Sequence, residues 1–260
     1  MTHPPYPIIF AGAGPGDPEL MTIKAMKALE QADLVIYAGS LVPEAVLCWK
    51  GKYTIAMSSA GMALEEIVDK MATSAKTGQR VVRLHTGDPS LYGAIFEQIR
   101  ELQARKIPYT VIPGVTAAMA AAAAMGMEYT LPEVTQTLIL TRMSGRTPVP
   151  EAEALEKLAD HKASMAIYLS IGLVKNVQKI LEKAYGPSSP CAIAYKVSHP
   201  EQAIFFTSID SLTETCHQKS ITRHALIIVG KAVEVCQGNT DLIKSKLYDA
   251  EFTHGYRQGK

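Results

Sequence analysis

The sequence has no excess of charge of either sign. Its 260 residues carry 26 basic and 25 acidic side chains, a net charge of +1. A protein that binds nucleic acid through the phosphates needs a surplus of lysine and arginine. The overall charge therefore argues against a nucleic-acid partner, although it leaves room for a local basic patch.

Cysteine motifs and long apolar runs are also missing. The four cysteines form no C-x-x-C pair and are widely spaced, which suits reduced thiols in a cytoplasmic protein better than a zinc site or a disulfide framework. The alanine-rich run over residues 117–126 is too short to cross a bilayer. The opening segment MTHPPYPIIF has no signal-peptide pattern. We therefore expect a cytoplasmic protein with no membrane partner.

Motifs of nucleophilic and metal-dependent catalysis are absent too. The chain contains no G-x-S-x-G segment, and no two histidines have the spacing of metal ligands. We expect neither a serine nucleophile nor a metal site.

The segment FAGAGPGDPELMT, residues 10–22, resembles a nucleotide-binding loop but lacks its defining residues. Gly12, Gly14 and Gly16 do not fit G-x-G-x-x-G, because Asp17 stands where the third glycine belongs. No lysine follows at the spacing of a phosphate-binding loop. A nucleotide-dependent oxidoreductase is therefore disfavoured, and the loop needs a ligand of another kind.

The first half of the chain alternates short apolar runs with longer helical patterns. Such a rhythm predicts βαβ units and a parallel sheet. The expected strands are Pro7–Ala11, Asp33–Ala38, Tyr53–Ala56, Arg80–Thr86 and Tyr109–Ile112. The expected helices are Glu19–Gln31, Met62–Thr77 and Tyr92–Lys106.

The turns after these five strands are rich in glycine. They read GAGPGD, AGSLVP, SSAGM, TGDPSLYG and PGVT, and parallel strands would bring them to one edge of the sheet, where α/β proteins bind ligands. A structural interpretation also applies, because Asp17-Pro18 and Asp88-Pro89 have the pattern of a helix start. For all five turns together we favour ligand binding, since short connections do not need so much glycine.

The second half predicts a mixed sheet. Only SHPEQ separates the expected strands Cys191–Val197 and Ala203–Thr207, which is the length of a hairpin. Further strands are expected at Thr137–Thr141, Ser164–Ser170 and His224–Gly230, with helices at Glu151–Asp160, Val174–Tyr185 and Ser208–Gln218. We expect an N-terminal domain over residues 1–118, a C-terminal domain over 119–236, and a polar tail over 237–260 that forms a peripheral helix or a frayed end.

Three segments in order carry a resemblance to a known family. AGAGPGDPELMT, TGDPSLYG and PGVTAA resemble the tetrapyrrole methylases, and the resemblance covers roughly residues 7–235. Within that family YAGSLV, HTGDPSLYGAI and TQTLILTRMSGRTPVPE resemble the branch that methylates carbon 11 of precorrin-4 on the route to cobalamin. The order and length of these segments make the resemblance specific.

The resemblance implies two αβα domains, the first with a mainly parallel sheet and the second with a mixed one. It also implies S-adenosyl-L-methionine in the cleft between them, with S-adenosyl-L-homocysteine as product. That ligand has no phosphate, which explains the missing lysine. Carried over onto this sequence, the cofactor contacts are Pro15, Thr86, Gly87, Asp88, Leu91, Tyr92, Thr116, Ala117 and Leu169.

The implied substrate is a polycarboxylate tetrapyrrole, and the family tends to form homodimers. Arg142 and Arg146 are the candidate substrate contacts, because guanidinium forks suit carboxylates; surface arginines in a polar loop are the alternative. His85 and Tyr92 are candidates for a general base, and a strand-end histidine with a purely structural role is as plausible for His85.

One departure from the family bears on the substrate. Family members that act on uroporphyrinogen carry an aspartate–arginine pair where Ala38 and Gly39 follow Tyr37 here, which fits the precorrin-4 branch. Diphthine synthases and ribosomal-RNA ribose methylases share the fold, but the segment from Arg142 to Arg146 argues against both. Another precorrin C-methyltransferase and a non-catalytic S-adenosylmethionine-binding module remain alternatives.

Overall fold

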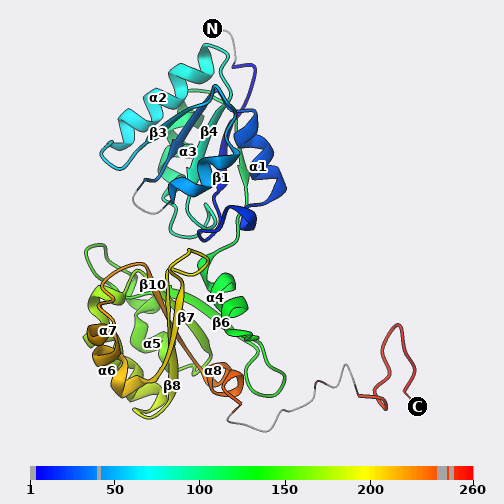
Figure 1. The fold of residues 1–260 in the computed structure, drawn as a ribbon, viewed down its shortest axis with the longest axis vertical. Coiled ribbons are helices and arrows are strands. Elements are labelled where there is room, and N and C mark those ends of the chain that lie inside the picture. Colours follow the sequence, from blue (N-terminus) through cyan, green and yellow to red (C-terminus); the bar gives the residue numbers. More distant parts are fainter. Residues whose placement is uncertain (1–3, 40–41, 239–244, 246–248, 260) are drawn as a thin grey trace. The chain divides into compact units, whose positions relative to one another are not determined.

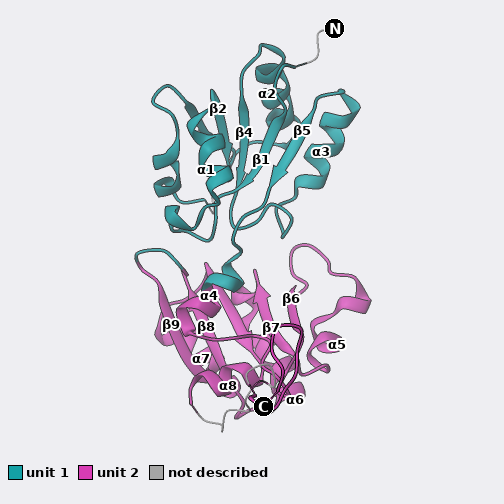
Figure 2. Cartoon of the chain, turned by 90° about the vertical axis from the view of Figure 1, so that its right-hand side faces the viewer, with its two compact units in different colours: residues 1–120, 198–200 teal, residues 121–197, 201–260 magenta. Residues whose placement is uncertain are grey.

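The computed structural model describes residues 4–39, 42–238, 245 and 249–259 (Figure 1). By its internal contacts the chain divides into two compact units (Figure 2). Unit 1 comprises Met1–Ala120 together with Ser198–Pro200, and unit 2 comprises Ala121–Val197 together with Glu201–Lys260. The alanine-rich helix α4 (Ala117–Met125) contains the boundary between them.

Unit 1 is built on a five-stranded sheet of order β3-β2-β4-β1-β5, in which every pairing is parallel. The predicted parallel sheet is thus confirmed. Its strands are β1 (Ile8–Gly12), β2 (Leu34–Tyr37), β3 (Ile55–Ser58), β4 (Val81–His85) and β5 (Tyr109–Ile112). β3 begins later than predicted, because the backbone N–H of Thr54 closes a turn onto Gly51 O at 3.1 Å.

Each face of this sheet has its own apolar core, because successive side chains of a strand point to opposite faces. Ile8, Phe10 and Ile36 belong to the core under α2 (Leu64–Lys76) and α3 (Ile95–Ala104). The opposite core includes Ala11, Val35 and Leu84, with side chains from α1 (Ile23–Glu30) and from a 3-10 helix, η2 (Glu44–Trp49). Arg83 and His85 alternate with Val82 and Leu84, so they face α2 and α3.

The three predicted helices of unit 1 begin later than the sequence predicts, α2 by two residues and the other two by more. The expected helix Glu19–Gln31 is a short 3-10 helix, η1 (Pro18–Leu20), followed by α1. Thr22 separates the two, since its side chain accepts a hydrogen bond from Ala25 N at 3.2 Å and caps α1. The helix expected from Tyr92 begins at Ile95, because Tyr92 and Ala94 have φ angles of 57° and 49°, which no right-handed helix accepts.

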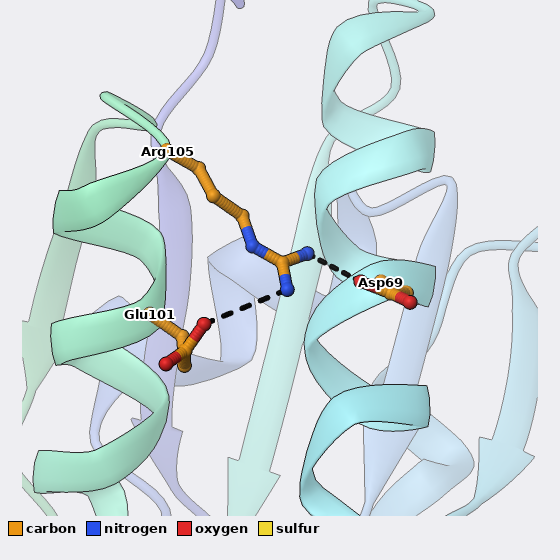
Figure 3. A network of polar contacts seen from close by, with 3 residues as sticks. All are labelled: Asp69, Glu101 and Arg105. Carbon is orange, nitrogen blue, oxygen red and sulfur yellow. Dashed lines mark hydrogen bonds and ion pairs between the residues drawn. The ribbon is translucent and has the colours of Figure 1, made fainter.

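Arg105 holds α2 and α3 side by side on the sheet (Figure 3). It lies just after α3, where its guanidinium pairs with Asp69 of α2 and, at 3.6 Å, with Glu101 of its own helix. Such surface pairs contribute no more than about 1 kcal/mol each. Their role is to connect α2 with α3, and these two helices together cover the face of the sheet that carries Arg83 and His85.

Unit 2 contains a mixed five-stranded sheet of order β6-β7-β10-β8-β9. β6 and β7 pair in parallel, and the other pairings are antiparallel. The strands are β6 (Leu138–Arg142), β7 (Ser164–Tyr168), β8 (Pro190–Tyr195), β9 (Ala203–Ser208) and β10 (Ala225–Val229). The prediction of a mixed sheet with a hairpin between β8 and β9 is confirmed.

Helices and an apolar core pack against the sheet of unit 2. Buried side chains of Met165, Ile193 and Ile227 from the sheet pack with Leu181 and Leu212 from the helices. The helices are α5 (Leu155–Ala159), α6 (Val174–Tyr185), α7 (Leu212–Gln218) and α8 (Lys231–Cys236), with 3-10 helices η3 (Glu151–Glu153), η4 (Ile171–Leu173) and η5 (Ile209–Ser211). The predicted helix Glu151–Asp160 is therefore η3 followed by the shorter α5.

The predicted polar tail over residues 237–260 lies partly outside the described residues. Its described part, 237–238, 245 and 249–259, contains turns and an isolated bridge between His254 and Arg257, and no helix. None of the helices in the part of the chain that the structure describes has both the length and the apolar character required to span a bilayer.

Candidate functional site

Three glycine-rich turns of unit 1 meet through their main chains. They follow the carboxyl ends of β1, β4 and β5, which are neighbours in the sheet. Gly87 N donates to Gly14 O at 2.8 Å and Gly14 N donates to Gly87 O at 3.3 Å, so the turns after β4 and β1 pair as a short bridge. This edge of the sheet is where α/β proteins bind ligands.

The turns approach so closely that two of the glycines have no room for a side chain. A Cβ atom at Gly12 would lie 2.5 Å from Gly87 O, and one at Gly114 would lie 2.1 Å from the same oxygen. Gly87 itself has space around its Cα, but its φ of +60° is a left-handed conformation that favours glycine. The glycines are therefore required for the backbone arrangement of the site.

Asp88 ties the turn after β4 to the turn after β5. Its Oδ2 accepts a hydrogen bond from Gly114 N at 2.8 Å, and its Oδ1 accepts one from Ser90 N at 2.8 Å. Burial raises the pKa of the Asp88 carboxyl, but the hydrogen bonds from Ser90 and Gly114 outweigh burial and leave the pKa below its ordinary value. The carboxylate is thus engaged by the chain's own loops and shapes the site.

Residues 198–200 add a contact to the first turn that the sequence did not suggest. Ser198 Oγ accepts a hydrogen bond from Asp17 N at 3.0 Å. The His199 ring lies against Gly16, where an added Cβ atom would be 2.4 Å from its Cδ2. Asp17 itself caps η1 through a hydrogen bond from Glu19 N, so the helix-start interpretation of Asp17-Pro18 is correct. In the sequence, Ser198 and His199 stood out only as part of SHPEQ, which was interpreted as the connection of a hairpin.

The remaining candidate cofactor contacts of unit 1 lie on the same turns. Pro15 follows Gly14 and is buried, Thr86 precedes Gly87 and is half-buried, and Leu91 continues that loop. Tyr92 is 42% exposed. Thr116 and Ala117 stand where the turn after β5 enters α4. The structure thus brings the unit 1 candidates together at the carboxyl edge of the sheet.

His85, a candidate general base, is enclosed by protein. It is 3% exposed, stacks on Phe10 with ring centroids 6.0 Å apart, and its Nε2 has no hydrogen-bond partner in the described part of the chain. Burial, with a smaller effect from the Arg83 charge, lowers the pKa of His85 to about 3. A general base works best with a pKa near the operating pH, so His85 is a poor proton acceptor at neutral pH.

Leu169 occupies a strained position in unit 2. It follows β7, has a φ of 52°, and its side chain is 63% exposed. The buried Ser170 beside it donates to Tyr168 O at 2.6 Å and accepts from Met143 N at 2.8 Å, which links the ends of β7 and β6. Strain and exposure at the carboxyl end of a strand are typical of a residue that serves a ligand.

The two candidate substrate arginines differ in their surroundings. Arg142 ends β6, and its Nη1 and Nη2 donate to the carbonyls of Thr147 at 3.1 Å and Pro148 at 2.8 Å. Arg146 is exposed on the loop that Arg142 holds, and its guanidinium contacts no polar group among the described residues. Arg142 therefore shapes the loop, whereas Arg146 presents a charge to solvent.

The described residues contain no group of three or more histidine, cysteine, aspartate or glutamate side chains that could hold a metal ion. The four cysteines are free thiols.

The fold is that of an α/β protein in which glycine-rich turns without a phosphate-binding lysine meet at the carboxyl edge of a parallel sheet. The sequence pattern of the Tetrapyrrole (Corrin/Porphyrin) Methylases matches residues 7–213. The chain is 46% identical over 252 residues to the cobalt-precorrin-4 C(11)-methyltransferase of Methanocaldococcus jannaschii, covering 96% of each chain. It is 43% identical to the precorrin-4 C(11)-methyltransferase of Pseudomonas aeruginosa, covering 97% of this chain and 99% of the relative. The chain belongs to the tetrapyrrole methylase family.

Solved structures show the same fold. A cobalt-precorrin-4 methyltransferase, described as a cobalamin biosynthetic enzyme, superposes with a TM-score of 0.84 at 43% identity, covering 87% of this chain and 95% of that one. A uroporphyrin-III C-methyltransferase from Thermus thermophilus, complexed with S-adenosylhomocysteine, superposes with a TM-score of 0.71 at 25% identity, covering 88% of this chain and 94% of that one. The α/β fold with one parallel and one mixed sheet is therefore that of the family.

Proposed function

We propose that the protein is an S-adenosylmethionine-dependent methyltransferase that methylates carbon 11 of precorrin-4 or cobalt-precorrin-4 in cobalamin biosynthesis. The observation that carries the proposal is the near-full-length likeness to relatives with that activity, at 43–46% identity. The glycine-rich turns support it as well. They carry no phosphate-binding lysine, and S-adenosylmethionine has no phosphate group.

The residues present fit the cofactor. The turns after β1, β4 and β5 meet through their main chains, and the segments 12–17, 86–91 and 113–117 contain no lysine or arginine that would repel a sulfonium. When bound, S-adenosylmethionine supplies an electrophilic methyl group and leaves as S-adenosylhomocysteine. Thr86, Gly87 and Thr116 are the residues that we propose to hold it, and Leu169 is a further candidate that the family resemblance implies.

The chain's own contribution to the reaction is alignment. Methyl transfer from sulfur to carbon is an in-line displacement whose nucleophile is the electron-rich macrocycle, so no side-chain nucleophile is required. Holding two reactants near 3–3.5 Å in the correct orientation lowers the barrier by about 7–11 kcal/mol. Turns that are locked to one another by Gly12, Gly87 and Gly114 provide such rigidity.

The substrate's carboxylates need cationic partners, and Arg146, which is exposed on the loop after β6, is the candidate that we propose. Its planar fork can bind a carboxylate in a bidentate manner. Arg142 supports it by holding the loop between them. For proton removal, Tyr92 is a better candidate than His85, since it is exposed at the same turn.

The test is incubation with isotopically labelled S-adenosylmethionine and a panel of precorrins, with and without cobalt, followed by mass analysis of the product. The proposal predicts one added methyl group, at carbon 11, on precorrin-4 or its cobalt form. Methylation at another carbon would identify another precorrin C-methyltransferase. Cofactor binding without methyl transfer to any member of the panel would indicate a non-catalytic binding module.

Two further features belong to this proposal. We propose a homodimer, as is common in the family, and light scattering on the purified protein would measure its mass. We also propose a cytoplasmic location, because four free thiols suit a reducing compartment.

A further inference from the structure

A pocket of about 280 Å³ lies in unit 1 beside the turn after β4. It is lined by Arg83 and His85 of β4, by residues of α2 and α3, and by the loop that joins β4 to α3. Ligand pockets commonly have volumes of about 300–1,000 Å³. This pocket is therefore suited to one functional group or a small molecule, and not to a cofactor or a macrocycle.

Arg83 brings an uncompensated positive charge to the pocket. Its side chain is 4% exposed, donating from Nε to Gln98 Oε1 at 3.1 Å and from Nη1 to Ile36 O at 3.2 Å. Both acceptors are neutral, and no carboxylate of a described residue lies within ion-pairing distance of the guanidinium. Burial lowers the pKa of Arg83 only to about 10, so it stays cationic at neutral pH. A buried charge without a partner is costly.

His85 also lines the pocket, and one of its ring nitrogens is unpaired in the described part of the chain. Its Nε2 is buried and has no hydrogen-bond partner among the described residues, a condition that is rare in folded proteins. The imidazole is neutral because burial keeps its pKa low, so one of its two nitrogens carries a proton and can donate it. A cation and a donor thus line the same small space.

We propose that this pocket binds a single carboxylate group, with the Arg83 guanidinium as its ion-pair partner and His85 Nε2 as a hydrogen-bond donor. A carboxylate supplies acceptors for both and neutralises the buried charge. The exposed carboxylate of Glu97 also lines the pocket and disfavours a doubly charged phosphate. The ligand is either a small free carboxylate or a carboxylate side chain of the macrocycle; the second source rests on the proposed function.

The pocket also adjoins the proposed cofactor turn. Thr86 lines it directly, and so do Tyr92 and Ala94, two non-glycine residues of the loop with left-handed backbone. A carboxylate bound there would hold the loop that begins at Gly87. We therefore expect a bound carboxylate to stabilise the conformation of the turn after β4.

Propionate is the probe. Its binding is followed through the imidazole signals of His85 in a two-dimensional NMR titration of the full-length protein. The His85 signals are assigned with a His85→Gln variant. Propionate should shift them and saturate in the millimolar range, whereas propionamide, which has the same shape without the charge, should leave them unchanged. Inorganic phosphate should bind more weakly than propionate. Absence of a shift with propionate, or an equal shift with propionamide, overturns the proposal.

Gln98→Glu is the decisive variant, because it supplies an internal carboxylate next to the Arg83 guanidinium. It should weaken propionate binding by about tenfold or more while retaining the fold, since an ion pair replaces a neutral hydrogen bond. Gln103→Glu makes the same change on the same helix at an exposed position that bonds to the Tyr109 hydroxyl, and should bind propionate as the parent does. Equal affinity in the two variants refutes the role of Arg83.

A competition experiment separates the two sources of the carboxylate. If the macrocycle supplies it, precorrin-4 should displace propionate from the pocket of the parent protein. If precorrin-4 binds without displacing propionate, the ligand is a free carboxylate. Because the propionate titration needs no methyl transfer, its outcome is independent of whether the proposed enzymatic activity is found.

Discussion

The carboxylate of Asp88 accepts a hydrogen bond from the backbone N–H of Gly114 at 2.8 Å. These two residues lie 26 positions apart, on turns that follow β4 and β5. Between those strands in the sheet stands β1, whose own turn pairs with Gly87. The Asp88 side chain thus connects the turn after β5 to the two turns that Gly14 and Gly87 pair. The geometry of the proposed cofactor site depends on this connection.

Replacing Asp88 with asparagine should weaken S-adenosylhomocysteine binding by about tenfold, equivalent to about 1.4 kcal/mol. The amide keeps one oxygen, so either Gly114 N or Ser90 N loses its acceptor and the turns separate. Calorimetric titration measures the effect.

Asp33→Asn provides the matched control for this change. Asp33 Oδ2 accepts a hydrogen bond from Arg80 N at 2.7 Å, but before β2, away from the glycine turns. It should leave the affinity for S-adenosylhomocysteine unchanged. Equal affinities in the parent and in Asp88→Asn would show that Asp88 does not shape the site.

Substitution of Gly87 should reduce cofactor affinity through backbone strain. Its φ is +60°, and a Cβ atom there would meet nothing closer than Thr116 Cα at 3.6 Å. Gly87→Ala should therefore cost about 1–2 kcal/mol from conformation alone, and Gly87→Val should cost more and abolish binding without unfolding the chain. Thermal denaturation and calorimetric titration measure the two effects separately.

Gly126→Ala isolates strain from function. Its φ is +63° and an added Cβ atom meets nothing within 4 Å, but it lies at the end of α4 and not at the turns. It should lower stability by a similar amount and leave cofactor binding intact. If Gly87→Val binds S-adenosylhomocysteine as tightly as the parent, the turn has only a structural role.

The sheets could be predicted because their signals are local. Apolar runs separated by helical patterns indicated a parallel sheet, and the five residues of SHPEQ indicated a hairpin. The pairing of Asp17 N with Ser198 Oγ could not be predicted, because the two residues are 181 positions apart and Ser198 belongs to no motif. The separation of the two residues along the chain, and not the strength of the hydrogen bond, made this contact unpredictable.

The chemistry of single residues was less accessible than the fold. Arg83 alternates with Val82 and Leu84 like any polar residue of a strand, and only the packing of α2 and α3 shows that it is buried. The left-handed backbone of Tyr92 and Ala94 could not be predicted either, since non-glycine residues rarely adopt it. Arg142 directly follows the expected strand Thr137–Thr141, which indicated that it is the more rigid of the two arginines, but its hydrogen bonds to the carbonyls of Thr147 and Pro148 could not be predicted.

Acid should destabilise the protein through His85. Its pKa is about 3 in the folded chain and near 6.5 when unfolded, so the unfolded state binds more protons between these values. The contribution of His85 to the free energy of unfolding is thus fully present above about pH 6.5 and is lost as the pH falls. Between about pH 6.5 and about pH 5 this group should account for about 2 kcal/mol of the unfolding free energy.

Urea unfolding in buffers without carboxylates measures this contribution. The His85→Gln variant should show a shallower loss of stability in acid than the parent by that amount. His217→Gln, at an exposed position at the end of α7, should retain the parent's dependence. Parallel curves for the parent and His85→Gln would contradict the effect of burial on this imidazole.

The two arginines of the β6 loop should separate substrate binding from turnover. Arg146 is exposed and has no polar partner among the described residues, so Arg146→Ala should raise the KM for the tetrapyrrole by about ten- to a hundredfold, the loss of one charge-assisted contact. Its affinity for S-adenosylhomocysteine should stay near that of the parent. Arg146→Lys should recover only part of the loss, because an ammonium cannot form the bidentate fork.

Arg142 should act differently because its guanidinium is already engaged with the carbonyls of Thr147 and Pro148. Arg142→Ala releases the loop that carries Arg146, so it should lower kcat as well as raise KM. Arg100→Ala, an exposed arginine of α3 whose guanidinium lies over the Phe96 ring, is the control and should change neither constant. Steady-state kinetics on the variants decides between a substrate-binding loop and a solvated one. Unchanged KM and kcat in both Arg142→Ala and Arg146→Ala would show that neither side chain takes part in binding the substrate.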